Sequence, residues 1–163
     1  MKDTMKDTII CDLDGTLFGI EHRRHHVAKV PGKKRDFKAF EAAIPQDTVN
    51  EAVFRVIQDV VEMRNHPDDR FYRVVFVTGR HERTREMTEE AIAVHCKWYP
   101  SSDYTLHMRP DTDNRADNIF KQEVLDTKLD KDRILFCLDD RQQVVDMWRR
   151  NGLTCFQVAE GNF

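Results

Sequence analysis

Side chains that could carry phosphoryl chemistry follow three apolar segments of this chain. Residues 8–11 and 134–138 are each followed by two carboxylates and residues 71–77 by a hydroxyl, and these side chains are Asp12, Asp14, Thr78, Asp139 and Asp140. If the segments are parallel strands, their carboxyl ends share one edge of the sheet, where ligands bind in open α/β folds. Clustered carboxylates repel one another and need a cation. All-oxygen ligation suits Mg²⁺ better than zinc or a soft metal, so the sequence predicts a magnesium site.

A carboxylate and Mg²⁺ together are suited to phosphoryl transfer. Magnesium in proteins commonly binds one or two carboxylates and a substrate phosphate, and an aspartate can attack phosphorus to form an aspartyl-phosphate. Asp14 lies two residues after Asp12, where its side chain diverges and could donate a proton to the leaving oxygen. Gly15 permits a sharp turn after the strand, and Thr78 with a lysine could hold the equatorial phosphate oxygens.

The rest of the sequence predicts the elements that must position these groups. Apolar strand-like segments alternate with segments of helical periodicity, which indicates βαβ units, a mainly parallel sheet and helices on both faces. The predicted strands are residues 8–11, 71–77, 104–108, 134–138 and 153–158. The predicted helices begin at Asp47 or Thr48 and cover residues 82–98, 115–128 and 141–151. The stripes expected to be buried are Val49, Ala52, Val53, Val56, Ile57, Val60 and Val61 in the first helix, and Met87, Ala91, Val94 and Trp98 in the second.

A basic insert follows the first predicted strand. Residues 18–47 are expected to form a flap or minimal cap with one helical turn at 37–43, inside a single domain that spans residues 1–163. Within this insert, residues 22–38 contain seven Lys or Arg against one Asp, although the whole chain has a net charge of −3. Such a basic patch on an acidic body favours local contact with a polyanion. Thr48 and Glu51 match a capping box, and residues 1–7 are expected to be flexible.

Composition excludes several classes of protein. The 163 residues suffice for one domain, and no apolar segment approaches the ~18 residues of a membrane span. The N-terminus is polar and contains acids, unlike a secretion signal, so the expected location is cytoplasmic, with no membrane partner. Four cysteines without a CxxC pair are expected to be buried free thiols.

The order of these motifs resembles the haloacid dehalogenase (HAD) superfamily of phosphatases. Residues 12–17 (DLDGTL) match its first motif, Thr78-Gly79-Arg80 resembles the second, Lys121 is a candidate for the third and Asp139-Asp140 for the fourth. The resemblance implies a Rossmann-like HAD fold and Mg²⁺ as cofactor. Asp12 would then be the nucleophile. Asp14 would be the general acid and then the base, and it would lend its backbone carbonyl to the metal. Asp139 would be a metal ligand, and Asp140 a ligand through water or a partner of Lys121.

A more specific resemblance, over residues 9–163, is to the 3′-phosphatase domain of bacteriophage polynucleotide kinase–phosphatase. It is carried by residues 139–150 (DDRQQVVDMWRR), by Cys155-Phe156-Gln157-Val158-Ala159 and by Arg115, Asp117 and Lys121. It implies removal of 3′-phosphate from DNA or RNA ends and from nucleoside 3′-monophosphates, in nucleic-acid end repair. The positions implied to be needed for activity are Arg23, Arg80, Asp117 and Lys121, with Thr78 and Gly79 also at the substrate. The next residue, Arg24, is an alternative to Arg23, and Arg80 is equally suited to bracing aspartates.

Other functions remain open on the residues alone. The chain has no GxxxxGK[ST] motif, so kinase activity is not expected of it, and a separate 5′-kinase or a ligase is the expected partner. The alternatives are a small-molecule phosphatase or nucleotidase, a non-catalytic phosphate-binding module and a phospho-accepting receiver domain. No residue pattern decides between DNA and RNA. Phe18, just before the basic flap, is the candidate for stacking on a base, and Trp148 is expected in the core.

Overall fold

A five-stranded parallel sheet forms the centre of the molecule. The computed structural model describes residues 6–62, 72–96 and 104–161. The strands are β1 (Thr8–Cys11), β4 (Arg73–His81), β5 (Tyr104–Arg109), β6 (Ile134–Asp139) and β7 (Cys155–Gln157). Their spatial order is β5-β4-β1-β6-β7, and all four pairings are parallel. The central strand β1 therefore places its carboxyl end between those of β4 and β6.

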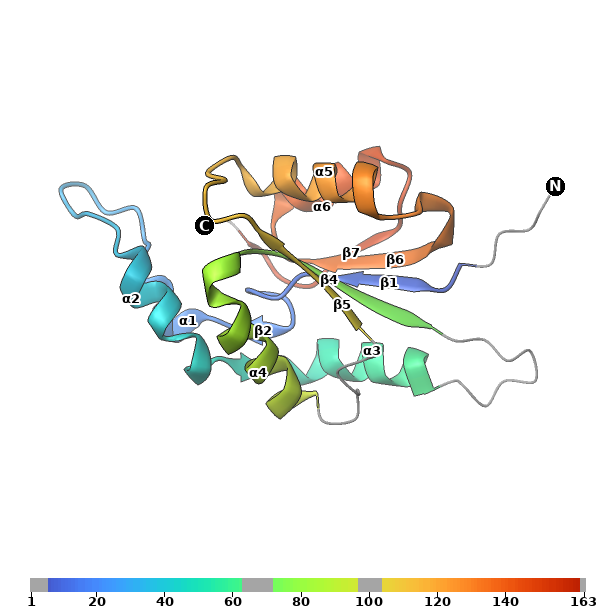
Figure 1. Ribbon diagram of the computed structural model, residues 1–163, viewed down its shortest axis with the longest axis horizontal. Coiled ribbons are helices and arrows are strands. Elements are labelled where there is room, and N and C mark those ends of the chain that lie inside the picture. The colour runs from blue at the N-terminus through green and yellow to red at the C-terminus, as the bar shows by residue number, and fades with distance from the viewer. Residues whose placement is uncertain (1–5, 63–71, 97–103, 162–163) are drawn as a thin grey trace.

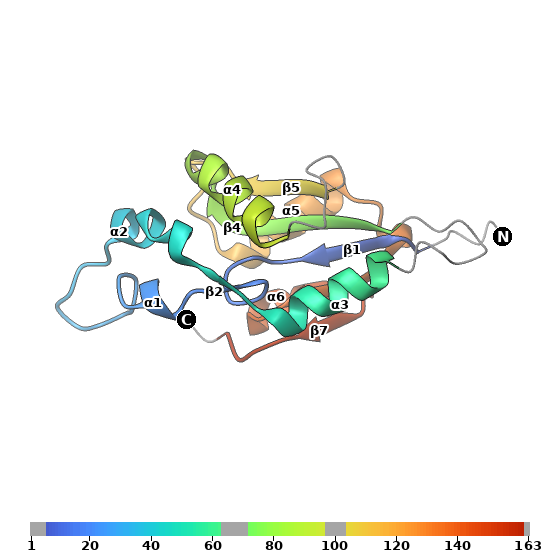
Figure 2. The same cartoon turned by 90° about the horizontal axis from the view of Figure 1, so that it is seen from below.

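Two pairs of helices cover the two faces of this sheet (Figures 1 and 2). Helices α3 (Glu51–Glu62) and α4 (Arg85–His95) lie on one face, and α5 (Asp117–Lys128) and α6 (Gln142–Arg150) lie on the other. Successive side chains of a strand point to opposite faces. Accordingly, Ile9 and Cys11 belong to the core under α3 and α4, whereas Ile10 belongs to the core under α5 and α6. The predicted α/β architecture is confirmed.

The segment between β1 and α3 forms the flap and projects beyond the carboxyl ends of the strands (Figure 1). It contains β2 (Phe18–Gly19), α1 (Glu21–Arg24), α2 (Phe37–Ala42), a 3₁₀ turn (Ile44–Gln46) and β3 (Thr48–Val49). β2 and β3 pair antiparallel and bring the two ends of the flap together. The expected helical turn at 37–43 is present as α2, where the Asp36 side chain accepts a hydrogen bond from the Ala39 N–H at 2.9 Å.

The predicted capping box at Thr48 and Glu51 is wrong. Thr48 is in β3, opposite Gly19 of β2, so its backbone is extended and cannot begin a helix. Helix α3 begins at Glu51, and the carbonyl of Asn50 accepts its first backbone hydrogen bond, from the Phe54 N–H. Pairing with a distant strand here overrides a local sequence signal.

The second predicted strand was expected to end before the Thr78-Gly79-Arg80 motif, but β4 continues through it to His81. The pairing of β4 with β5 shifts register between Thr78 and His81, so Gly79 and Arg80 lie in an irregular part of the strand. Such irregularities redirect side chains and are common beside active sites. Phe71, the predicted first residue of this strand, lies outside the described residues.

The predicted apolar stripes were only partly right. In α4 the buried residues are Thr88, Ala91 and Ile92, and Val94 is exposed, because the helix begins at Arg85 after a 3₁₀ turn (Glu82–Thr84) that rotates its buried face. In α3, Ala52 and Val56 are exposed. Trp98 lies outside the described residues.

Other predictions about the core are confirmed. Trp148 is fully buried, and the four cysteines are buried free thiols.

A further 3₁₀ turn (Lys131–Arg133) precedes β6. Among the described residues, no helix is both long and apolar enough to cross a lipid bilayer.

Candidate active site

Three carboxylates converge at the carboxyl ends of β1 and β6. Asp12 follows β1, Asp139 ends β6 and Asp140 comes next in the chain. All three residues are buried, and each offers an oxygen within 4.8 Å of the others. β1 and β6 are neighbouring parallel strands, with Cys11 opposite Leu138, so the residues that follow them must meet. The structure thus brings together three of the four aspartates that the sequence placed at this edge.

A buried lysine from the neighbouring helix contacts this acidic cluster. The Lys121 Nζ lies 2.7 Å from Asp12 Oδ1, 2.9 Å from Asp139 Oδ2 and 3.5 Å from Asp117 Oδ2. Its side chain is fully buried, so Lys121 is not a solvated surface lysine. Of the two roles implied for Asp140, metal ligation through water or pairing with Lys121, the structure does not show the second, because the ion pairs of Lys121 are with Asp12, Asp117 and Asp139.

Burial and like charge make this cluster electrostatically strained. Burial raises the pKa of Asp12 well above its ordinary value, Lys121 opposes the shift, and Asp139 and Asp140 add to it. Burial and then Asp139 raise the pKa of Asp140 to about 6. Burial alone would lower the pKa of Lys121, but its carboxylate neighbours, Asp117 and Asp12 foremost, raise it well above its usual value. One ammonium therefore leaves negative charge that a cation could neutralise.

Two glycines allow the backbone to pack closely around Asp140. Gly15 has a φ of +84°, a conformation that residues with a Cβ rarely adopt, and a Cβ there would collide with the Asp140 carboxylate. A Cβ at Gly161 would collide with the same carboxylate. The Asp140 carbonyl accepts hydrogen bonds at 3.0 Å from the Gly161 N–H and from the Gln157 side chain. The C-terminal segment therefore helps to fix Asp140, a role that its sequence did not reveal.

The donor set of the cluster fits a magnesium ion. Three close carboxylate oxygens from Asp12, Asp139 and Asp140 are all hard ligands, and their charge exceeds that of Lys121. Mg²⁺ prefers oxygen ligands and keeps several waters or substrate oxygens. Among the described residues, no group of three potential ligands that includes histidine or cysteine was found, so a zinc site of that composition has no support there.

Metal binding at this cluster should depend on pH. We expect saturating Mg²⁺ to raise the Tm by roughly 5 °C at pH 7.5, and by progressively less as the pH falls through 6. The raised pKa values of Asp12 and Asp140 mean that protons compete with the metal there. In the metal-free protein, the stability itself changes with pH in the opposite direction. Asp12 and Asp140 stabilise the folded state below about pH 4, and this stabilisation is lost as the pH rises through about 6.

Thermal unfolding from pH 5 to 8, with NaCl matched for ionic strength, measures this dependence. Asp139→Asn should abolish the Mg²⁺-dependent rise, whereas Asp59→Asn, on the exposed face of α3, should preserve it. An equal rise at pH 5 and pH 7.5 would contradict a site built from these carboxylates.

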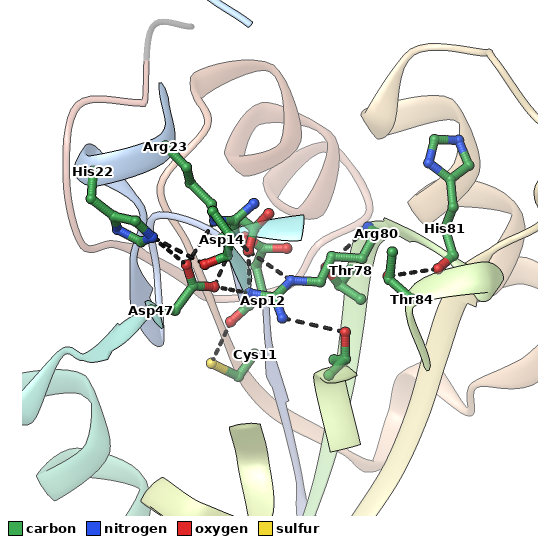
Figure 3. A network of polar contacts seen from close by, with 12 residues as sticks. Cys11, Asp12, Asp14, His22, Arg23, Asp47, Thr78, Arg80, His81 and Thr84 are labelled. Carbon is green, nitrogen blue, oxygen red and sulfur yellow. Dashed lines mark hydrogen bonds and ion pairs between the residues drawn. The ribbon is translucent and has the colours of Figure 1, made fainter. Parts of the chain in front are cut away.

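A second group of charges lies beside the acidic cluster and joins the core of the fold to the flap (Figure 3). The Asp14 Oδ1 accepts hydrogen bonds from Arg80 Nε and Arg23 Nη2, both at 2.7 Å. Asp47 accepts from Arg23 at 2.7 and 2.8 Å and from Arg80 Nη2 at 2.6 Å. Two guanidiniums and two carboxylates thus form a closed network. The Arg23 Nη1 is buried and has no hydrogen-bond partner within the described residues.

These contacts show where the structure places the residues of two alternatives that the sequence left open. Arg23 is fully buried in the network, whereas 37% of the neighbouring Arg24 side chain is exposed. Arg80 braces Asp14 and Asp47 in this conformation. The Asp14 side chain was predicted near the metal, but it lies outside the acidic cluster. Burial would raise its pKa, yet Arg80 and Arg23 outweigh burial and lower the pKa below its ordinary value.

Asp47 is the residue of this network that the sequence interpretation missed, because it was assigned to cap a helix. Asp47→Ala leaves Arg23 and Arg80 buried with Asp14 as their only carboxylate partner in the network. Removing one member of a buried ion pair typically costs 3–5 kcal/mol, and we expect a loss of about 3 kcal/mol in the free energy of unfolding. We also expect kcat/KM to fall about 10²-fold, because both guanidiniums lose their position.

Urea unfolding and phosphatase kinetics measure the two effects. Glu21→Gln, at a flap carboxylate that is 76% exposed, should change neither quantity. Wild-type stability and activity in Asp47→Ala would contradict the positioning role.

The remaining predicted residues, Thr78, Gly79 and Asp117, lie in β4 and at the start of α5. Thr78 is fully buried, and its hydroxyl accepts a hydrogen bond from the Arg80 N–H at 3.3 Å. At Gly79, a Cβ would come within 2.7 Å of Asp117 Oδ1, so glycine is needed for this close approach. Asp117 accepts a hydrogen bond at 2.9 Å from Arg109, which ends β5. Arg109 was missed, although the strand-end rule that found Asp12 also applies to it.

An open cleft leads from the solvent to these residues. It has a volume of about 980 Å³ and lies between the flap and the carboxyl edge of the sheet. Its acidic lining residues are Asp12, Asp14, Glu41, Asp113 and Asp117, and they are outnumbered by the basic ones, which are Arg23, Arg24, Lys29, Arg35, Arg80, Arg109, Arg115 and Arg141. The predicted stacking residue Phe18 does not line it: this ring is fully buried in the core, 5.4 Å from the Arg80 guanidinium. A polyanion fits a cleft with this lining.

Comparison with known proteins gives one family and one fold. Residues 6–163 match the family model described as the polynucleotide kinase PNKP phosphatase domain. Two chains from structures of the Pnkp1/Rnl/Hen1 RNA repair complex are 35% identical to this chain, with TM-scores of 0.70 and 0.69. Each alignment covers 98% of this chain, but only 44% and 48% of those chains, so this chain spans less than half of their length.

More distant structures share the fold alone. CbbY from Rhodobacter sphaeroides, solved with phosphate, is 15% identical, with a TM-score of 0.59 over 93% of this chain and 85% of its own. A haloacid dehalogenase-like hydrolase from Streptococcus pneumoniae is 12% identical, with a TM-score of 0.60 over 96% of this chain and 85% of its own. The predicted Rossmann-like HAD fold is therefore confirmed.

Proposed function

The chain belongs to the PNKP phosphatase domain family of HAD phosphatases, and from this premise we propose that it is a Mg²⁺-dependent polynucleotide 3′-phosphatase. It removes 3′-phosphate from DNA or RNA ends, and from nucleoside 3′-monophosphates, through an aspartyl-phosphate. The observation that carries the proposal is the position of Asp12, which contacts Lys121 within an acidic cluster at the floor of a basic cleft. The two 35% identical chains come from structures of an RNA repair complex, which supports a role in nucleic-acid end repair.

Asp12 is the nucleophile in this proposal. One carboxylate oxygen of Asp12 attacks phosphorus, and the bond between phosphorus and the 3′-oxygen breaks. The Lys121 ammonium, 2.7 Å from Asp12 Oδ1, keeps that side chain oriented and offsets negative charge as phosphate approaches. Asp12 is only 5% exposed, and the low exposure strengthens these electrostatic interactions.

Asp14 transfers the protons. It donates one to the leaving 3′-oxygen and later accepts one from the water that hydrolyses the aspartyl-phosphate. Arg23 and Arg80 hold Asp14 as a carboxylate while no phosphate is present. An incoming phosphate competes for both guanidiniums, so their hold on Asp14 weakens and its pKa rises towards the protonated form that the first step needs. Arg23 Nη1, which lacks a hydrogen-bond partner among the described residues, is an available donor for a phosphate oxygen.

The side chains of Asp12, Asp139 and Asp140 and the backbone carbonyl of Asp14 would hold Mg²⁺. The ion, when bound, withdraws charge from the phosphoryl group and offsets the repulsion between phosphate and the Asp12 carboxylate. Asp117 positions Lys121 and Arg109 through its two carboxylate oxygens. Thr78 and Gly79 shape the backbone beside the phosphate site.

A substrate panel across a salt series tests the proposal. It compares phosphate release from 3′-phosphorylated DNA and RNA oligonucleotides with release from free 3′- and 5′-mononucleotides. Wild-type protein with Mg²⁺ should act on 3′-phosphates, and its kcat/KM for oligonucleotides should fall steeply as salt rises, because counterions are released from several phosphates. Mononucleotide hydrolysis should depend on salt much less. Faster turnover of 5′-mononucleotides than of every 3′-phosphate would reject the proposal in favour of a nucleotidase.

Charge variants of the flap test which residues cause the salt dependence. Lys29→Ala and Arg35→Ala, both on the cleft wall, should each reduce the salt dependence for oligonucleotides. Lys128→Ala, at the exposed end of α5, is the matched control and should leave it unchanged. The expected partners are then DNA or RNA ends and a separate 5′-kinase or ligase that completes the repair.

A further inference from the structure

An exposed aromatic ring stands on the wall of the cleft. Phe37, the first residue of α2, is 47% exposed and lines the same cleft as Asp12 and Asp14. It belongs to neither of the two core clusters. Exposure of so large an apolar side chain gains nothing for the fold, since burial of the ring would stabilise the folded state. A ligand that enters the cleft could therefore contact the exposed ring of Phe37.

The backbone of the flap holds this ring in a defined place. The Asp36 N–H donates to the His26 carbonyl at 2.8 Å, which closes the loop of residues 27–35. The Asp36 side chain caps α2 through the Ala39 N–H at 2.9 Å. Phe37 comes directly after Asp36, which makes both of these hydrogen bonds. A ring with a fixed backbone loses less conformational entropy when a ligand binds than a ring on a free loop does.

A cation accompanies the ring. The Arg35 guanidinium carbon lies 5.1 Å from the Phe37 ring centroid, and Arg35 also lines the cleft. The other phenylalanine of α2 has a different neighbour: the guanidinium of Arg23 lies 4.2 Å from the Phe40 ring centroid. Phe40 thus packs against the network beside Asp14, whereas Phe37 and Arg35 stand further out on the flap. An aromatic ring with a guanidinium beside it is the arrangement on which single-stranded nucleic acids stack.

We propose that Phe37 and Arg35 form a stacking platform for an unpaired base at the 3′ end of the substrate. This inference rests on the proposed function. The base stacks on the Phe37 ring while Arg35 contacts a phosphate of the backbone, and the 3′-phosphate reaches Asp12 at the floor of the cleft. Every base has a π face, so the platform tolerates any sequence, but it requires a base that is not enclosed in a duplex. The preferred substrate class is therefore a single-stranded or frayed 3′-phosphate end.

The experiment compares two single-stranded 3′-phosphorylated oligonucleotides, one complete and one lacking the bases of its last two nucleotides. Phe37→Ala should lower kcat/KM on the complete oligonucleotide roughly tenfold. Its loss on the abasic oligonucleotide should be much smaller, because no base is present to stack. Phe37→Trp should retain or increase activity on the complete oligonucleotide. Phe156→Ala is the matched control, because Phe156 is 53% exposed but does not line the cleft, and it should show wild-type discrimination.

The outcomes separate this inference from the proposed function. Equal losses for Phe37→Ala on both oligonucleotides, or no loss on either, would overturn the stacking platform while wild-type hydrolysis upholds the 3′-phosphatase. No release of 3′-phosphate by the wild-type protein from either oligonucleotide would instead overturn the proposed function. Circular dichroism of each variant identifies a loss that comes from unfolding, and in that case Phe37→Trp compared with wild type on the two oligonucleotides decides the question.

Discussion

Asp12→Asn is expected to reduce kcat by about 10⁴-fold or more on every phosphorylated substrate. The amide is a very poor nucleophile, so the covalent step is lost, whereas Arg23 and Arg80, the proposed phosphate contacts, are unchanged. The fold should survive, because the change removes a buried carboxylate whose pKa burial raises and which Asp139 and Asp140 repel. Lys121 retains its contact with Asp139 at 2.9 Å. Phosphate release and thermal unfolding, measured on the same preparations, check both parts of this prediction.

Asp59→Asn is the matched control for this substitution, since it makes the same chemical change on the exposed face of α3. It should keep wild-type kcat. Substantial phosphate release by Asp12→Asn would show that another group attacks phosphorus. An Asp12→Asn protein that fails to fold would show instead that the carboxylate is needed for structure.

Lys121→Met is expected to be the most destabilising single change at the site and to abolish activity as well. The methionine side chain is of similar length but leaves Asp12, Asp139 and Asp117 without their shared ammonium. We expect the free energy of unfolding to fall by about 3–5 kcal/mol at pH 7.5 without metal. Mg²⁺ should restore part of this stability, because it neutralises the same carboxylates. Urea unfolding with and without Mg²⁺ measures both effects.

The pH dependence of Lys121→Met provides a second check. Without the ammonium, the already raised pKa of Asp12 rises further, so this carboxyl group favours the folded state below about pH 4 and opposes it as the pH rises. The variant should therefore recover stability as the pH is lowered from 7 to 5. Lys128→Met, at an exposed position on the same helix, should match the wild type throughout. A loss of stability in Lys121→Met that does not vary with pH would point to a packing defect instead of uncompensated charge.

Some of the site could be predicted because its signals are local. Asp12, Asp139 and Asp140 each follow or end an apolar strand, and parallel strands bring such positions to one edge whatever the details of packing. Lys121 was a candidate through the resemblance to the third HAD motif, and it lies one helical turn after Asp117, with 3.5 Å between the two charged groups. Periodicity likewise fixed the order of strands and helices, although the buried faces of α3 and α4 were partly wrong.

The flap could not be predicted in the same way, because its contacts are long-range. Asp47 has the sequence setting of a helix cap, and only the pairing of the short strands β2 and β3 turns it towards Arg23 and Arg80. Phe18, which the sequence offered as a stacking residue, is in β2 and buried in the core, whereas Phe37 lines the cleft. Strands of two residues carry almost no periodic signal. The sequence was enough to predict the order of the core strands and helices along the chain. It was not enough to predict which residues of the flap face the cleft.

The measurement that tests the central claim most directly is the location of phosphate during turnover. A 3′-phosphorylated oligonucleotide with a radioactive terminal phosphate is mixed with excess protein and Mg²⁺, quenched in acid within milliseconds, and the protein is digested and mapped. The account predicts transient label on the peptide that contains Asp12, sensitive to hydroxylamine as acyl phosphates are, and no label in Asp12→Asn. Rapid phosphate release by wild-type protein with no label at Asp12, or with label on another residue, would contradict it.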